Sequence, residues 1–163
     1  MTSNDTVNNT GGREHEASPP APRISRLFAL AAVLSLVGLA DAIYLTVEHL
    51  SGRSVRCTVT SGCSEVLSSA YATIGGYPLA FFGALAYFTA FSLATLAAFG
   101  SERAGKLLSV LVALMFAMSL WLLYLQAFVL HAFCQYCLLS AAITTLLLFI
   151  VIFRRATRRQ TMK

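Results

Sequence analysis

The sequence predicts an all-α integral membrane protein, a four-transmembrane-helix bundle with a short amphipathic half-helix in its first outer loop. Of its 163 residues 57% are hydrophobic and 12% charged, whereas soluble domains carry about 25% charged residues. The apolar run 107–153 has 47 residues, so a single helix would be about 70 Å long across a hydrocarbon core of about 30 Å. That run must therefore fold back on itself.

The first membrane span is predicted at Leu27–Val47, 21 residues with Asp41 as the only charge. Residues 1–22 are rich in Thr, Asn, Ser, Gly and Pro, which predicts a disordered cytoplasmic tail before a membrane domain at 23–153. A signal peptide cleaved near Ala40-Asp41-Ala42 is the alternative. The apolar run favours a span, because it is longer than a typical signal core of about 7 to 15 residues and continues past the cleavage point.

The connection Glu48–Tyr77 is the one long polar loop and contains Cys57 and Cys63. Five positions within it recur at the spacing of one helix face, which predicts a short amphipathic half-helix lying on the bundle as a lid. We expect Ser61 or Gly62 to be its N-cap. The five positions are Cys63, Val66, Leu67, Ala70 and Tyr71.

Three further spans follow. Pro78 is predicted in the first turn of the span Leu79–Phe99, and residues 100–103 form a tight polar turn. The run then divides into the spans Leu107–Leu130 and Cys134–Phe153, before a basic cytoplasmic tail at 154–163. The last span reaches 20 residues only when counted from Cys134, which places both of its thiols at the membrane boundary.

The basic residues predict the orientation. Ten Lys and Arg residues fall in the N-terminal tail, the second loop and the C-terminal tail, against two in the first loop. Positive residues favour the cytoplasmic side, so both termini are expected in the cytoplasm and all four cysteines on the outer face of the cell inner (plasma) membrane. Disulfides are stable in that compartment. Topology also explains the net charge of +5, so no nucleic-acid partner is expected.

Cys134-Gln135-Tyr136-Cys137 is a C-x-x-C motif at the start of a predicted helix. There the two sulfur atoms lie one turn apart, and the positive end of the helix dipole favours a thiolate at Cys134. Together with Cys57 and Cys63 this pair could pass a disulfide by thiol exchange. The alternative to a redox enzyme is a non-enzymatic membrane module. In it the four cysteines would form either structural disulfides or an all-cysteine metal site. The wider spacing of Cys57 and Cys63 argues against a zinc site. A disulfide within C-x-x-C closes too short a loop to stabilise the fold much, which argues against a purely structural role.

An ordered set of motifs resembles the bacterial branch of the vitamin K epoxide reductase family. The resemblance implies four helices around a quinone (menaquinone or ubiquinone), with electrons supplied by a periplasmic or extracellular thioredoxin-like protein in trans. The animal epoxide reductases carry Asn and Tyr where this chain has Leu79 and Ala141, which favours simple quinone reduction. The motifs are Cys57 and Cys63 six positions apart, then Cys-Ser-x-Val-x-Ser-Ser from Cys63, Gly76-Tyr77-Pro78-Leu79, Phe82-Gly83, and Cys134-x-x-Cys137.

The resemblance also implies roles for single residues. Cys57 would exchange with the partner, Cys63 would react with Cys134, and Cys137 would pass electrons to the quinone. Ser69 matches the family's serine six residues after the second loop cysteine.

Three ionisable residues are candidates from their positions alone. His131 precedes Cys134 by three residues and could tune its thiolate or donate to a quinone oxygen. Asp41 and His49 could accept protons during exchange. In the simpler alternative, Asp41 is only hydrogen-bonded, His49 is an exposed boundary residue and His131 an interfacial anchor.

Overall fold

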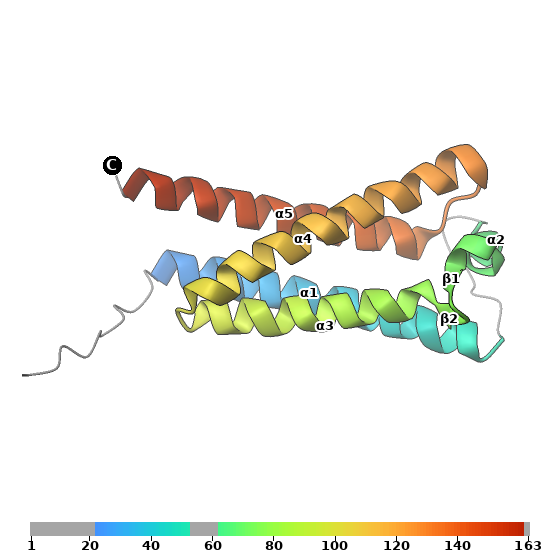
Figure 1. The fold of residues 1–163 in the computed structure, drawn as a ribbon, viewed down its shortest axis with the longest axis horizontal. Coiled ribbons are helices and arrows are strands. Elements are labelled where there is room, and N and C mark those ends of the chain that lie inside the picture. Colours follow the sequence, from blue (N-terminus) through green and yellow to red (C-terminus); the bar gives the residue numbers. More distant parts are fainter. Residues whose placement is uncertain (1–21, 53–61, 162–163) are drawn as a thin grey trace, which may run out of the picture.

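A computed structural model describes residues 22–52 and 62–161. Within them, four helices are long and apolar enough to cross a membrane. These are α1 (Pro22–Leu50), α3 (Leu79–Ala98), α4 (Glu102–Tyr124) and α5 (Gln135–Thr161), which run side by side as a bundle (Figure 1). The predicted all-α, four-span membrane bundle is confirmed.

Several helix ends differ from the predicted ones, and α1 already begins at Pro22. α1 continues to Leu50, and α5 continues through most of the predicted basic tail. Glu102 and Arg103, predicted in the turn, already belong to α4, because the Ser101 hydroxyl accepts a hydrogen bond from Ala104 N–H at 3.4 Å and caps the helix. Beyond Tyr124, α4 passes into a π-helical turn, η2 (Leu125–Val129).

The predicted half-helix is present but shorter than its hydrophobic pattern. It consists of α2 (Cys63–Ser68) followed by a separate 3-10 turn, η1 (Ala70–Ala72). The break lies at Ser69, whose backbone is extended and whose hydroxyl donates to the Val66 carbonyl at 2.7 Å. A serine hydroxyl that bonds nearby backbone competes with helix continuation, which explains the break. Gly62 is the N-cap residue, as one of the two predicted alternatives.

A two-stranded hairpin, which the sequence did not predict, joins η1 to α3. Strand β1 (Thr73–Ile74) pairs antiparallel with β2 (Tyr77–Pro78). Gly75 and Gly76 form its two-residue turn with φ of 60° and 86°, the left-handed backbone that tight hairpin turns require. Pro78 therefore lies in β2 and is the N-cap of α3, one position before the predicted helical turn.

Small residues let the helices approach closely. The buried core of the four long helices contains six alanines, all on α1, α3 and α4, a packing mode typical of membrane helices. The closest approach is at Gly38 of α1, where an added Cβ would lie 2.3 Å from the Tyr87 ring of α3. That ring in turn reaches α5, since the Tyr87 and Ser140 hydroxyls are 2.8 Å apart.

The bundle has two distinct ends (Figure 1). α2 and the hairpin cover one end, where the chain also turns between η2 and α5. The start of α1, the turn between α3 and α4, and the end of α5 lie at the other. The cysteines of the described residues therefore gather at the end that carries the lid.

Candidate active site

Cys63 and Cys134 meet in a small buried cluster under the lid, together with Leu45 of α1. Both cysteines have an exposed fraction of 0%. Cys63 is disulfide-bonded, whereas Cys134 and Cys137 are free thiols. Cys57 lies outside the described residues. The structure thus holds Cys63, which is in a disulfide, and Cys134, a free thiol, in the same buried cluster.

The lid is seated directly on the turn that leads into the C-x-x-C motif. At Gly62, immediately before Cys63, an added Cβ would lie 2.7 Å from the Phe133 backbone nitrogen and 2.9 Å from the Ala132 Cβ. Contacts this short leave no room for a side chain at position 62. Glycine there allows the two chain segments to touch, and Cys63 and Cys134 follow them immediately.

Cys134 is the N-cap residue of α5, and its carbonyl accepts a hydrogen bond from Leu138 N–H at 3.0 Å. Its sulfur interacts with the Cys137 side chain and with the backbone N–H groups of Cys137 and Tyr136. The side-chain bond with Cys137 and these backbone bonds lower the pKa of Cys134 from 9.0 to about 7, although burial and the nearby charge of Asp41 oppose the shift. With a pKa of about 7, Cys134 is partly a thiolate at neutral pH.

Gln126 joins both cysteines of the motif, and the sequence analysis did not identify it. Its side-chain Oε1 accepts a hydrogen bond from the Cys134 backbone N–H at 2.9 Å, and the side chain also hydrogen-bonds the Cys137 thiol. Its backbone carbonyl accepts from Ala132 N–H at 3.2 Å. One signal could have found it: Gln126 is the single amide side chain in the predicted span 107–130, where a polar group is costly unless it is bonded.

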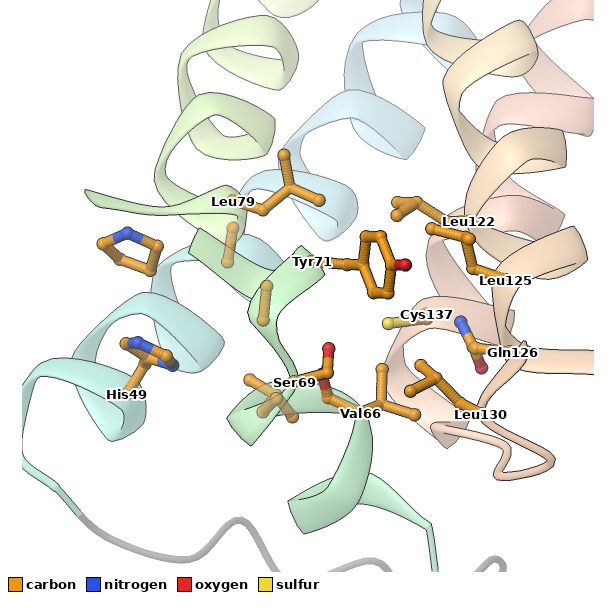
Figure 2. Close-up of a pocket in the computed structure, with 14 residues that line it drawn as sticks. His49, Val66, Ser69, Tyr71, Leu79, Leu122, Leu125, Gln126, Leu130 and Cys137 are labelled. Carbon is orange, nitrogen blue, oxygen red and sulfur yellow. The ribbon is translucent and has the colours of Figure 1, made fainter. Parts of the chain in front are cut away.

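Cys137 faces a cavity of about 110 Å³ between the lid and the helices. Figure 2 shows its sulfur beside the Gln126 amide and the Tyr71 ring, with Leu122 and Leu125 on the same side. The walls are mostly aliphatic, and four polar groups other than Tyr71 line the edges. These are His49, Ser69, Gln126 and the Cys137 thiol.

The remaining candidates divide between the cavity and the surface. Ser69 and His49 line the cavity. His131 lies exposed in the turn before Cys134, with a left-handed backbone at φ 49°, and the residues that line the cavity do not include it. Asp41 is half-buried in α1, and its charge acts on the Cys134 thiol.

A second cavity of about 200 Å³ lies deeper in the bundle, between α3, α4 and α5. It shares Leu79 and Leu122 with the first cavity. Its polar wall is made by the Tyr87 and Ser140 pair and by Thr144, whose hydroxyl donates to the Ser119 hydroxyl at 3.1 Å. The second cavity therefore lies next to the first, on the side of the membrane-spanning helices.

A comparison with known protein families agrees with this arrangement. The family model described as the vitamin K epoxide reductase family matches residues 29–152. That range covers most of the chain, including nearly all of the four spans and both cysteines of the C-x-x-C motif.

Proposed function

Since the chain belongs to the vitamin K epoxide reductase family and is therefore a multi-pass membrane oxidoreductase, we propose that it is a thiol:quinone oxidoreductase. It would re-oxidise an exported thioredoxin-like partner and reduce a membrane quinone, and so support disulfide bond formation. One observation carries the proposal: Cys63 and Cys134 are buried in one small cluster, and Cys137 faces an apolar cavity.

The relay begins with thiol exchange. The partner's dithiol reduces a Cys57–Cys63 disulfide and leaves as a disulfide. The Cys63 thiolate then attacks a Cys134–Cys137 disulfide at Cys134, forming a mixed disulfide and releasing the Cys137 thiolate. Cys57 resolves the mixed disulfide, which restores the outer disulfide and leaves Cys134 and Cys137 reduced. A disulfide at Cys63 with free thiols at Cys134 and Cys137 corresponds to this last state, just before quinone reduction.

Quinone reduction closes the cycle. The two inner thiols give two electrons and two protons to the quinone, so they become a disulfide and the quinone becomes a quinol. The aliphatic walls fit a quinone ring, and Ser69 and Gln126 supply polar groups at its edge. The second cavity would take the isoprenoid chain. Menaquinone and ubiquinone share this chemistry, and both are candidate substrates.

We place the site on the outer face of the cell inner (plasma) membrane. The support is the distribution of Lys and Arg, which favours a cytoplasmic location for the bundle end opposite the thiols. In that orientation the lid faces a compartment where an exported partner folds and disulfides persist.

The decisive experiment measures quinone-dependent oxidation of a reduced thioredoxin-like protein by membranes that contain the full chain. Cys134→Ala and Cys137→Ala should each reduce the rate to the background of membranes without the protein. Ser68→Ala, an exposed change on α2, is the control and should keep the full rate. If both cysteine variants stay active, the relay is wrong, and a membrane module with structural disulfides becomes the better interpretation.

A further inference from the structure

We propose that Gln126 is a further catalytic residue, whose side-chain amide fixes the first turn of the C-x-x-C helix and donates a hydrogen bond to the Cys137 thiolate. The inference rests on the proposed function, because it assigns a role within the step between the inner dithiol and the quinone. It concerns a residue that neither the cysteine motifs nor the predicted lid involve.

The hydrogen bonds fix the orientation of the amide. Oε1 accepts from the Cys134 N–H at 2.9 Å, so the amide nitrogen must point to the other side. Figure 2 shows that side facing the Cys137 sulfur, with which the Gln126 side chain is hydrogen-bonded. An amide nitrogen can only donate. Gln126 is thus an acceptor toward one cysteine of the motif and a donor toward the other.

The backbone around Gln126 is specialised for this position. Gln126 lies in the π-helical turn η2, where Leu130 N–H bonds the Leu125 carbonyl, five residues back, at 2.9 Å. The bond from Ala132 N–H to the Gln126 carbonyl then folds the chain back toward α5. Single π turns are frequent at functional sites. This one holds a side chain with an exposed fraction of 1% against both thiols.

The chemistry explains why an amide is suited to this place. An apolar cavity disfavours the charged form of a thiol, yet the electrons leave from a Cys137 thiolate. A neutral amide N–H stabilises the negative sulfur without competing for its proton, because an amide does not titrate in this range. The electron count is unchanged: two thiols become one disulfide, and one quinone becomes one quinol.

The test compares Gln126→Met, which keeps the length and removes both hydrogen bonds, with Gln126→Asn, which keeps an amide on a shorter side chain. Ser109→Ala is the control, because it removes a buried hydrogen-bonding side chain elsewhere, in α4. In a Cys134→Ala background of the full chain, the alkylation rate of Cys137 by N-ethylmaleimide is measured at fixed pH by mass spectrometry. Loss of a hydrogen bond to a charged sulfur should slow alkylation about tenfold to a hundredfold in Gln126→Met and less in Gln126→Asn.

Turnover gives the second readout. With Cys134 present, Gln126→Met should lower kcat for quinone reduction by a similar factor, with a smaller change in KM for quinone, while Ser109→Ala keeps both. Alkylation of Cys137 at the control rate in Gln126→Met would overturn the inference; if that variant does not fold, the same result in Gln126→Asn would do so. Absence of quinone reduction by the unsubstituted protein would instead remove the proposed function and leave the alkylation comparison valid.

Discussion

At the scale of single residues, the thiolate of Cys134 is stabilised first by the Cys137 side chain and then by the backbone N–H groups around its N-cap position. Backbone N–H groups of the first turn and the Cys137 thiol surround one sulfur, and the result is a pKa of about 7. Cys137 is the third residue of α5, and its thiol lines the cavity instead. The two cysteines, three residues apart, thus have different surroundings, and the proposed relay gives them different tasks.

This difference predicts the pH dependence of Cys134. Only the thiolate is alkylated, so the rate of Cys134 alkylation in the reduced protein should rise with pH, with a midpoint at about pH 7. Below the midpoint the thiol is protonated and the rate falls tenfold per pH unit. Iodoacetamide labelling followed by mass spectrometry of the Cys134 peptide measures the profile, and its shape does not depend on the slow access expected of a buried sulfur.

Two variants at position 137 separate the causes. Cys137→Ala removes the side-chain hydrogen bond that contributes most to the lowered pKa of Cys134, so the midpoint should move upward. Cys137→Ser keeps a donor and should remain closer to the original midpoint. An identical midpoint in Cys137→Ala and the unsubstituted protein would show that the helix amides alone stabilise the thiolate.

The sequence was sufficient for the cysteines but not for the residues around them. Spacing alone placed Cys134 and Cys137 one turn apart at a helix start. Gln126 could not be placed, because its bond to Cys134 spans eight residues and depends on a π turn that has no spacing signature. His131 was a reasonable candidate by proximity, yet its left-handed backbone leaves the side chain exposed in the turn.

At the scale of elements, the lid is positioned by the contact at Gly62. Gly62→Ala would force Cβ against the Phe133 backbone and push Cys63 away from Cys134. Since small misplacements of reacting groups cost up to about a hundredfold in rate, partner oxidation should fall about tenfold or more. The amount of Cys63–Cys134 mixed disulfide trapped in a Cys137→Ala background should fall as well.

Ser68→Ala, on the same short helix but exposed, is the matched control for this change. It should leave both turnover and trapping unchanged. Full trapping of the mixed disulfide in the Gly62→Ala protein would mean that the close contact between Gly62 and the Phe133 backbone is not needed to position Cys63.

Two glycines at the interface of α1 and α3 predict opposite outcomes. At Gly38 a new Cβ would lie 2.3 Å from the Tyr87 ring, whereas at Gly83 it would lie 3.8 Å from the Ala42 Cβ, an ordinary contact. Gly38→Ala should therefore destabilise the protein by about 1 to 3 kcal/mol. Gly83→Ala should be neutral or slightly stabilising, because Ala favours helix. Thermal unfolding in detergent measures both, and equal melting temperatures would contradict the packing at Gly38.

The spans were predictable because length and apolar content define them almost completely. The exact ends of the helices and the structure of the lid were not predictable in this way. Ser69 breaks the half-helix through one local hydrogen bond, and Gly75 and Gly76 form a hairpin too short to show strand alternation. Arg154 was assigned only to topology, yet its guanidinium lies over the Phe28 ring at 4.6 Å, so α5 continues as packed helix where a tail was expected.

At the scale of the whole molecule, the two ends of the bundle differ in composition. The thiols, the lid and the cavity lie at one end, and the helix ends near the basic clusters lie at the other. Lys and Arg are retained on the cytoplasmic side during insertion, so the distribution of charge predicts which end meets which compartment. The proposed exchange chemistry needs the oxidising side, and the same distribution of charge predicts that the thiols lie there.

Two exposed apolar residues at opposite ends allow a direct test of this orientation. Leu50 at the end of α1 has an exposed fraction of 70%, and Phe99 after α3 has one of 84%. In intact cells, a membrane-impermeant maleimide should label Leu50→Cys, whereas Phe99→Cys should be labelled only after the membrane is permeabilised. Peptide mass spectrometry separates these introduced thiols from the native cysteines. The reverse labelling would place the thiols in the cytoplasm, where an exported partner could not reach Cys57 and the proposed electron flow could not begin.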